Sequence, residues 1–123
     1  MQVEIDGVTV ADTHRPVLIF ETGLPTRYYI PPEDVRLDLF TATDHSTGCP
    51  YKGTAQYWSL TAGGDVPANV VWSYPEPLRA VTPIRDHIAF YNEAVDIVVD
   101  GERLERPETP FSRLLFPRKP RKP

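Results

Sequence analysis

The chain has 123 residues, of which 41% are hydrophobic and 24% charged, and it carries a net charge of −4. This size suits one domain with a single core, the composition is that of a folded globular protein, and the acidic balance argues against a general nucleic-acid binder. A single cysteine excludes an internal disulfide, and no apolar run approaches the roughly 20 residues that a membrane helix needs.

The first predicted element is a β-hairpin. Val3 and Ile5 precede the pair Asp6-Gly7, and Val8 follows it. Asp-Gly between β-prone residues is a strong hairpin signal, because both turn positions tolerate positive φ. Fourteen prolines, about twice the average share of roughly 5%, are spread along the chain. Since proline disfavours helix interiors and central strand positions, we expect short strands separated by turns throughout.

The segment from residue 17 to residue 48 is predicted to contain three strands and one helical turn. Val17–Phe20 has the apolar run of a buried strand, and Arg27–Ile30 is a β-prone segment that ends at two prolines. The second of these, Pro32, suits the first turn of a short helix. Val35–Leu39 alternates apolar and charged residues, which predicts a strand with one buried face, and Thr41–Gly48 is expected to be a polar loop.

The second half of the chain continues this pattern of short elements. They are predicted from β-prone runs and from the turn residues between them. In chain order they are a strand at Thr54–Leu60, a turn at Gly63–Asp65, a strand at Val70–Tyr74, a helical turn at Thr82–Asp86, a hairpin of Ile88–Tyr91 and Val95–Val99 around Asn92-Glu93, and a turn at Asp100-Gly101.

This series of elements predicts an all-β fold. Many short strands at regular spacing, with no long helix, are typical of a compact barrel or sandwich-like domain of antiparallel strands with one or two short helical turns. We assign residues 1–115 to this single β domain. Residues 116–123 are basic and proline-rich, and we interpret them as an extended, mobile tail and as the only part of the chain suited to nucleic acid.

One pentapeptide, Cys49–Gly53, combines the single cysteine with a lysine just before an aromatic strand. If Cys49 and Lys52 met, the cation would favour a thiolate, so these two are the candidate catalytic residues, with His45 or His87 as a base. The alternative is that Cys49 packs as a small buried residue. The chain lacks the paired cysteines of a structural zinc site, and we predict no metal and no cofactor.

The aromatic residues indicate a site more strongly. Adjacent pairs such as Tyr28-Tyr29 and Tyr57-Trp58 lie on predicted strands, where successive side chains point to opposite faces. One ring of each pair then packs in the core, and the other can line a cleft with basic residues. The alternative is that all the rings pack two sheet layers. The predicted ligand-binding residues are Arg27, Tyr29, Tyr51, Lys52, Trp58, Trp72 and Tyr74.

Four segments of the chain together resemble the signatures of a known family. They are Glu21–Val35, Cys49–Gly53 with Tyr57-Trp58, Val71–Pro77, and Ile88–Tyr91 with Val95-Asp96. The family that they resemble is a bacterial one named domain of unknown function 427. The resemblance implies a compact β-tent-like (Mss4-like) fold. In several relatives of that architecture a zinc ion joins two hairpins through paired cysteines, which this chain lacks. A histidine often precedes the cysteine in this family, and Gly48 stands there in this chain.

We therefore predict a cytoplasmic protein, without a membrane partner, that binds an anionic or aromatic small molecule in an aromatic and basic cleft. Arg27 and Lys52 would pair with an anionic group, and the rings would stack on a planar or cationic moiety. One alternative is a non-enzymatic protein-interaction module or homodimer that uses exposed aromatic residues.

The other alternative is an enzyme that uses Cys49 and Lys52. Some catalogues label the family nucleotidyltransferase-like, which would imply nucleotidyl transfer. That chemistry normally uses a carboxylate pair that holds a divalent metal near a glycine-rich loop, and the sequence carries no such motif.

Overall fold

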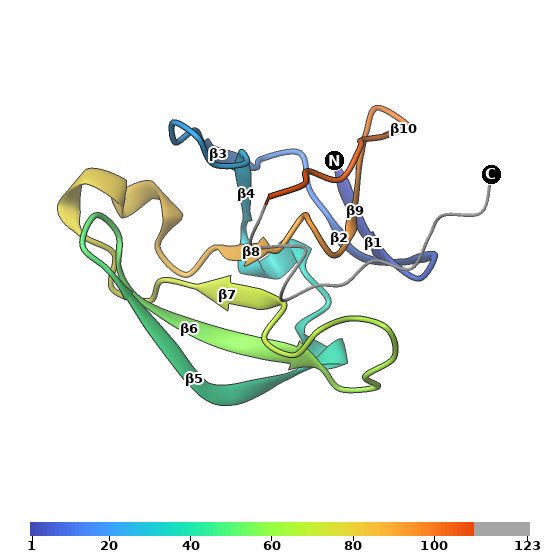
Figure 1. The fold of residues 1–123 in the computed structure, drawn as a ribbon, viewed down its shortest axis with the longest axis horizontal. Helices are drawn as coiled ribbons and strands as arrows, with labels where there is room; N and C mark the ends of the chain where they lie inside the picture. The colour runs from blue at the N-terminus through green and yellow to red at the C-terminus, as the bar shows by residue number, and fades with distance from the viewer. Residues whose placement is uncertain (110–123) are drawn as a thin grey trace.

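The computed structural model describes residues 1–109 and shows an all-β fold, as predicted (Figure 1). Within that range the strands form two antiparallel sheets, one with four strands in the order β10-β9-β1-β2 and one with six in the order β3-β4-β8-β7-β6-β5. No helix of the described residues is long and apolar enough to cross a membrane. The predicted tail at 116–123 and the end of the predicted domain lie outside the described residues.

The four-stranded sheet is built from the two ends of the described chain. β1 (Gln2–Ile5) and β2 (Val8–Asp12) form the predicted first hairpin, and its turn residues Asp6 and Gly7 have φ of 50° and 80°. β9 (Asp96–Val99) pairs with β1 and with β10 (Glu102–Arg103). The turn between β9 and β10 also has positive φ at both of its Asp-Gly residues. Aspartate and glycine tolerate this conformation, so both turns follow from local sequence.

The six-stranded sheet comes from the middle of the chain. β5 to β8 follow one another as an antiparallel meander, β4 pairs with the far side of β8, and β3 forms the outer edge. The strands are β3 (Val17–Ile19), β4 (Arg27–Ile30), β5 (Phe40–Cys49), β6 (Gly53–Leu60), β7 (Val71–Ser73) and β8 (Ile88–Phe90). Three short 3-10 segments of the described chain connect them, namely η1 (Pro32–Asp34), η2 (Leu37–Leu39) and η3 (Arg79–Ile84). η1 is the helical turn predicted after Pro31, and η3 begins three residues before the turn predicted at Thr82.

Two predictions between residues 35 and 48 are wrong. Val35–Leu39 is not a strand, because Leu37–Leu39 forms η2, in which the Leu39 amide donates to the Arg36 carbonyl over 3.1 Å. Both leucines still pack against the core, so the apolar alternation came from burial and not from extended backbone. Thr41–Gly48 is not a loop but most of β5, an edge strand with largely exposed polar side chains. Such a strand lacks the apolar alternation that marks a half-buried one.

The predicted hairpin between Ile88–Tyr91 and Val95–Val99 is also wrong, although both strands exist. β8 belongs to the six-stranded sheet and β9 to the four-stranded sheet. The Ala94 amide donates to the Tyr91 carbonyl over 2.9 Å, and this turn carries the chain from one sheet to the other. A run of apolar residues on each side of a turn does not reveal which strands the two runs will pair with.

Strand β3 is present where it was predicted, but it is less buried than its apolar run indicated. It forms an outer edge of the six-stranded sheet, where Leu18 is exposed and Phe20, just after the strand, is 75% exposed. Val17 and Ile19 are half-buried on one face of the sheet. An edge position leaves one side of the strand without a neighbour, which explains the exposure.

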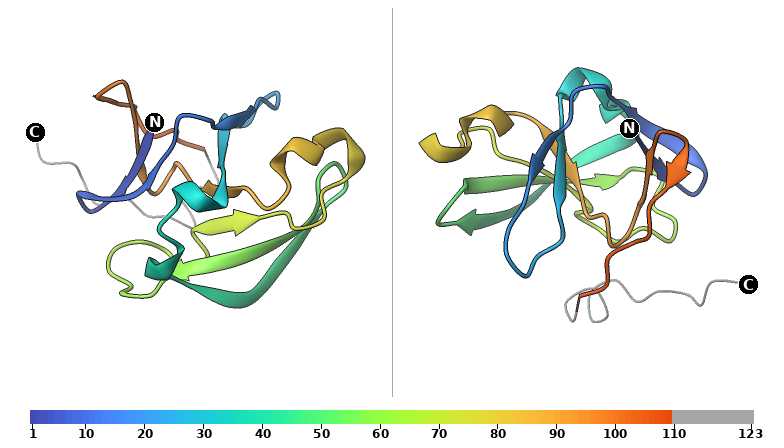
Figure 2. Two further views of the ribbon diagram at one scale, coloured as in Figure 1. Left: turned by 180° about the vertical axis from the view of Figure 1, so that it is seen from behind. Right: turned by 90° about the horizontal axis from the view of Figure 1, so that it is seen from above.

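The six-stranded sheet carries a core on each of its faces. One core lies between the two sheets and contains Val3, Ile5, Val10, Ile30, Val71, Ile88 and Phe90. The second core lies on the other face and contains Tyr29, Tyr57, Trp72, Tyr74 and Ile84, the last of which belongs to η3. Figure 2 shows η3 and the four-stranded sheet on opposite sides of the central strands.

The six-stranded sheet curls around the second core. Its edge strands are β3 and β5, and the loop after β3 meets the turn after β5 through an ion pair between Glu21 and Lys52. The Leu78 amide donates to the Lys52 carbonyl over 2.9 Å, which ties the segment before η3 to the same turn. Segments that are far apart in the sequence therefore close over one face of the sheet.

Candidate functional site

Strand register places the aromatic side chains on the face of the six-stranded sheet that carries the second core. Tyr29 of β4 and Trp72 of β7 both stand opposite Ala89 of β8, and Trp72 stands opposite Tyr57 of β6. Residues directly opposite each other in a sheet share a face. We use the name tyrosine face for this surface and its five rings. They are Tyr29, Tyr57, Trp72, Tyr74 and Tyr91.

The rings of the tyrosine face pack against one another. Trp72 lies edge-on to Tyr29 with ring centroids 6.2 Å apart, and it lies 4.5 Å from Tyr91. The indole nitrogen of Trp72 donates to the Tyr29 hydroxyl over 3.3 Å, and the hydroxyls of Thr47 and Tyr57 lie 2.8 Å apart. These contacts combine ring packing with satisfied polar groups, which is what buried tyrosine and tryptophan require.

Burial changes the acidity of three of these hydroxyls. It raises the pKa of Tyr29 to about 12, although the Trp72 hydrogen bond and the Arg27 charge lower that pKa. Burial also raises the pKa of Tyr74 and of Tyr91, and in Tyr91 a hydrogen bond with Tyr57 adds to the effect. All three phenols are therefore neutral at physiological pH, where they can donate and accept hydrogen bonds but cannot serve as phenolate bases.

A buried ion pair lies at one end of the tyrosine face. Nη1 of Arg27 donates to Glu93 Oε1 over 2.5 Å and to Asn92 Oδ1 over 2.6 Å, and Nη2 donates to Glu93 Oε2 over 3.1 Å. The Glu93 side chain is 2% exposed and that of Arg27 is 17% exposed. Cζ of Arg27 lies 5.4 Å from the ring centroids of both Trp72 and Tyr91, within the range of a cation–π interaction.

The β5–β6 turn lies at the other end of the tyrosine face. The Lys52 amide donates to the Cys49 carbonyl over 3.3 Å and closes the turn, while the Lys52 ammonium is bound to Glu21. Cys49 is half-buried with a free thiol, and it packs against the second core, which contains Tyr29 and Tyr74. The ammonium of Lys52 and the thiol of Cys49 thus have different neighbours in the structure.

The seven residues predicted to bind a ligand fall into three groups. Arg27, Tyr29, Trp72 and Tyr74 lie together on the tyrosine face, and Lys52 lies at its rim, bound to Glu21. Tyr51 points away from this cluster into solvent and is 77% exposed. Trp58 stands opposite Val71 on the other face of the sheet and packs against the core between the sheets. Tyr57, its neighbour in sequence, occupies the tyrosine face instead.

The two histidines considered as bases have different neighbours. The His45 ring contacts Tyr57 edge-on with centroids 4.6 Å apart, and Nδ1 of His87 lies 2.9 Å from the Arg85 carbonyl oxygen. Among residues 1–109, no group of three or more histidine, cysteine or acidic side chains is arranged to hold a metal ion.

Sequence reasoning missed five residues of this site, namely Glu21, Tyr57, Tyr91, Asn92 and Glu93. Asn92 and Glu93 directly follow one of the family-like segments, but the sequence pattern around them predicts the turn of a hairpin. The alternation of side chains along β6 was the available signal for Tyr57. Residues two apart on a strand share a face, and Ala55 is buried in the same cluster as Tyr57. Nothing in the sequence pattern pairs Arg27 with Glu93.

Comparison with known proteins bears on all four family-like segments. A family model described as "Domain of unknown function (DUF427)" matches residues 1–101, which includes every one of these segments. No curated protein matches the chain. The resemblance inferred from the sequence is confirmed at the level of the family, while the β-tent (Mss4-like) architecture stays a prediction.

Proposed function

The chain belongs to the family described as Domain of unknown function (DUF427), and we propose that it binds a planar aromatic or anionic small molecule at the tyrosine face, beside Arg27. The observation that carries this proposal is that the Arg27 guanidinium is held in a fixed orientation and is still partly exposed. Glu93 and Asn92 hold it in the plane of their hydrogen bonds, Trp72 and Tyr91 lie against it, and its side chain keeps 17% exposure. A guanidinium fixed in this way offers a flat surface for stacking at little entropic cost.

The balance of charge favours an aromatic ligand over an anionic one. Glu93 neutralises Arg27, and Glu21 neutralises Lys52, so neither cation is left without a counter-charge. An anion would have to displace a carboxylate, and Glu93 cannot leave without placing an unpaired charge in a buried environment. A planar ligand can instead stack on Arg27 and leave both ion pairs intact.

The tyrosine hydroxyls support the recognition of a polar ring. The raised pKa of Tyr91 keeps its phenol neutral, and this side chain is only half-buried. A neutral phenol can both donate and accept hydrogen bonds, and Tyr91 already shares one with Tyr57. Binding sites for small molecules commonly combine aromatic walls with a few fixed polar groups in this way.

The proposal can be tested by a thermal-shift screen with planar aromatics (adenosine, indole, nicotinamide) and with anions (phosphate, citrate). We expect at least one planar aromatic to raise the Tm and the anions to have little effect. Arg27→Lys keeps the charge and removes the planar stacking surface, so it should abolish the shift, whereas Arg85→Lys on the exposed surface should not. Failure of every probe, or equal binding by Arg27→Lys, would contradict the proposal.

A second candidate function is protein interaction, including homodimer formation. Four exposed apolar side chains support it, and they lie on the loops joined by the Glu21–Lys52 contact or next to them: Phe20, Leu24, Tyr51 and Leu78. Exposed aromatic residues are common at interface hot spots. Light scattering at increasing protein concentration tests the homodimer. A monomeric molecular mass at every concentration, in both the wild type and Tyr51→Ser, would rule out the homodimer.

The enzymatic alternative, with Cys49 and Lys52, stays a prediction, as does nucleotidyltransferase-like activity. Activation of the thiol by Lys52 would need the ammonium to exchange its contact with Glu21 for one with Cys49. The rate at which a thiol reagent modifies Cys49, compared between the wild type and Glu21→Gln, measures whether that exchange occurs. A rate no faster than that of a free thiol in both proteins would exclude this role.

A further inference from the structure

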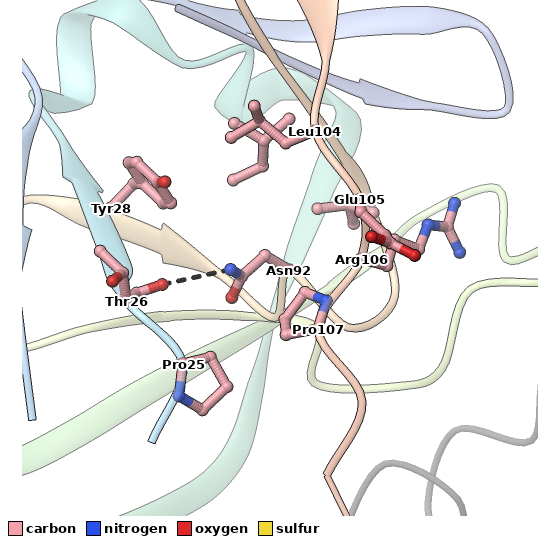
Figure 3. A pocket seen from close by; sticks show the side chains of 10 residues that line it. Pro25, Thr26, Tyr28, Asn92, Leu104, Glu105, Arg106 and Pro107 are labelled. Atoms are coloured by element: carbon pink, nitrogen blue, oxygen red, sulfur yellow. Dashed lines mark hydrogen bonds between the residues drawn. The ribbon is translucent and has the colours of Figure 1, made fainter. Parts of the chain in front are cut away.

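A small pocket lies apart from the stacked rings of the tyrosine face and is not used by the proposed function. It has a volume of about 170 Å³ and lies between the segment that leads into β4, the turn that links the two sheets, and the chain that leaves β10. Figure 3 shows Pro25, Thr26 and Tyr28 on one side, residues 104–107 on the other, and Asn92 between them. The pocket is therefore assembled from three segments that are distant in the sequence.

The most buried polar side chain that lines this pocket is Asn92, and the orientation of its amide is fixed. Its Oδ1 accepts from Arg27 over 2.6 Å, and its Nδ2 donates to the Thr26 carbonyl over 3.1 Å. The residue is 8% exposed. An amide nitrogen carries two N–H groups, and among residues 1–109 this nitrogen makes that single hydrogen bond. Its second N–H is thus a donor available to a ligand.

The walls of the pocket combine apolar and polar groups. Val95, Ile97 and Leu104 line it together with two prolines and the ring of Tyr28, and the exposed Glu105 lines it as well. Arg106 contributes its carbon stem, because Nε donates to Asp96 over 3.0 Å and its guanidinium points away from the pocket (Figure 3). Although burial raises the pKa of Asp96, hydrogen bonds from Arg106 and Arg103 hold it below the usual value, so this ion pair persists at neutral pH.

The size of the pocket limits what it can hold. An enclosed, engineered apolar cavity of about 150 Å³ binds one benzene molecule, and this pocket, which is partly open to solvent, has a similar volume of about 170 Å³. We propose that the pocket binds a neutral molecule with a single six-membered ring that carries one hydrogen-bond acceptor, which the free N–H of Asn92 recognises. Because Asn92 also binds Arg27, the pocket and the proposed aromatic site meet at this residue.

The test is an NMR titration of the full chain at neutral pH with benzene, pyridine and quinoline. Pyridine adds an acceptor to the benzene ring, and quinoline adds a second ring. We expect pyridine to shift the Asn92 side-chain and Leu104 backbone signals and to bind about fivefold more tightly than benzene, the value of one net hydrogen bond. Quinoline should bind more weakly than pyridine, because its second ring does not fit within the pocket, and the Trp72 indole signal should not respond, which separates this pocket from the aromatic site.

Variants show whether binding occurs in this pocket. Leu104→Trp fills it and should abolish pyridine binding, and Leu104→Phe, a milder filler, should weaken it. Leu78→Trp, at an exposed leucine elsewhere, should leave binding unchanged. Asn92→Asp keeps the acceptor for Arg27 but removes the amide donor, so the affinity for pyridine should fall to that for benzene. No shifts with any probe, equal affinity for benzene and pyridine, or binding insensitive to both Leu104 variants would overturn the proposal.

Discussion

Replacement of Glu93 by glutamine tests the energetic role of the ion pair at the tyrosine face. Glu93 is 2% exposed and makes two hydrogen bonds to Arg27, whose side chain is 17% exposed. Removal of one partner from a buried pair costs about 3–5 kcal/mol, because the other charge is left uncompensated. Glutamine can keep one hydrogen bond and Arg27 retains some solvent contact, so we expect a loss of about 3 kcal/mol. For a domain of this size that corresponds to a fall in Tm of roughly 10–15 °C.

A double-mutant cycle separates this coupling from the cost of each substitution. Arg27→Met removes the partner charge and keeps much of the side-chain volume. We expect Arg27→Met/Glu93→Gln to be more stable than the sum of the two single changes by about 2 kcal/mol, since the double variant leaves no unpaired charge. The free energy of unfolding is measured by urea denaturation followed by circular dichroism.

The surface pair of Arg15 and Glu33 provides a matched control. Nη2 of Arg15 lies 2.8 Å from Oε1 of Glu33, which is ordinary ion-pair geometry, but both side chains are more than 60% exposed. The same cycle at this pair should show no measurable coupling, because exposed pairs are screened by solvent. Additive effects at Arg27 and Glu93, or a loss in Glu93→Gln no larger than in Glu33→Gln, would refute the argument from burial.

Two further predictions concern pH and backbone conformation. Burial raises the pKa of Tyr29 from its ordinary value of 10.0 to about 12 in the folded protein. The contribution of the neutral phenol to stability is therefore complete below pH 10 and is lost as the pH rises through 12, a difference of about 3 kcal/mol. Urea denaturation between pH 9 and 12 should show a smaller loss of stability in Tyr29→Phe than in the wild type. An equal loss in both proteins would contradict this assignment. Gly53 has φ of 113°, and a Cβ there would lie 3.0 Å from the Glu76 carbonyl oxygen, whereas at Gly48 it would meet nothing within 4 Å. Gly53→Ala should therefore cost about 1–3 kcal/mol in urea denaturation, and a cost no greater than that of Gly48→Ala would show that the backbone relaxes freely.

The turns and most strand positions could be predicted from the sequence because they depend on neighbouring residues. Asp6-Gly7 and Asp100-Gly101 adopt the positive φ that aspartate and glycine tolerate, and Pro32 begins the expected 3-10 turn. The alternation of side chains along β6 also implied that Tyr57 and Trp58 lie on opposite faces. The prediction failed at β5 because this edge strand carries mostly exposed polar side chains, and such a composition is also typical of a loop.

The sequence indicated some residues of the candidate site by their type, but it could not show which of them share a face of the sheet. Arg27 and Trp72 stand out by residue type, and their segments match the family. Which ring faces which side depends on register, and both faces of this sheet turned out to be buried, so burial alone could not separate Trp58 from Trp72.

What the sequence determined by itself is therefore the class of fold, the turns and the family, all of which rest on local chemistry or on matched motifs. The tertiary structure decided the partners. Arg27 meets Glu93 at a separation of 66 residues because β4 pairs with β8, and Lys52 meets Glu21 at a separation of 31 because the β5–β6 turn lies against the loop after β3. Curvature and register arise from the packing of the whole sheet, and no segment carries that information alone.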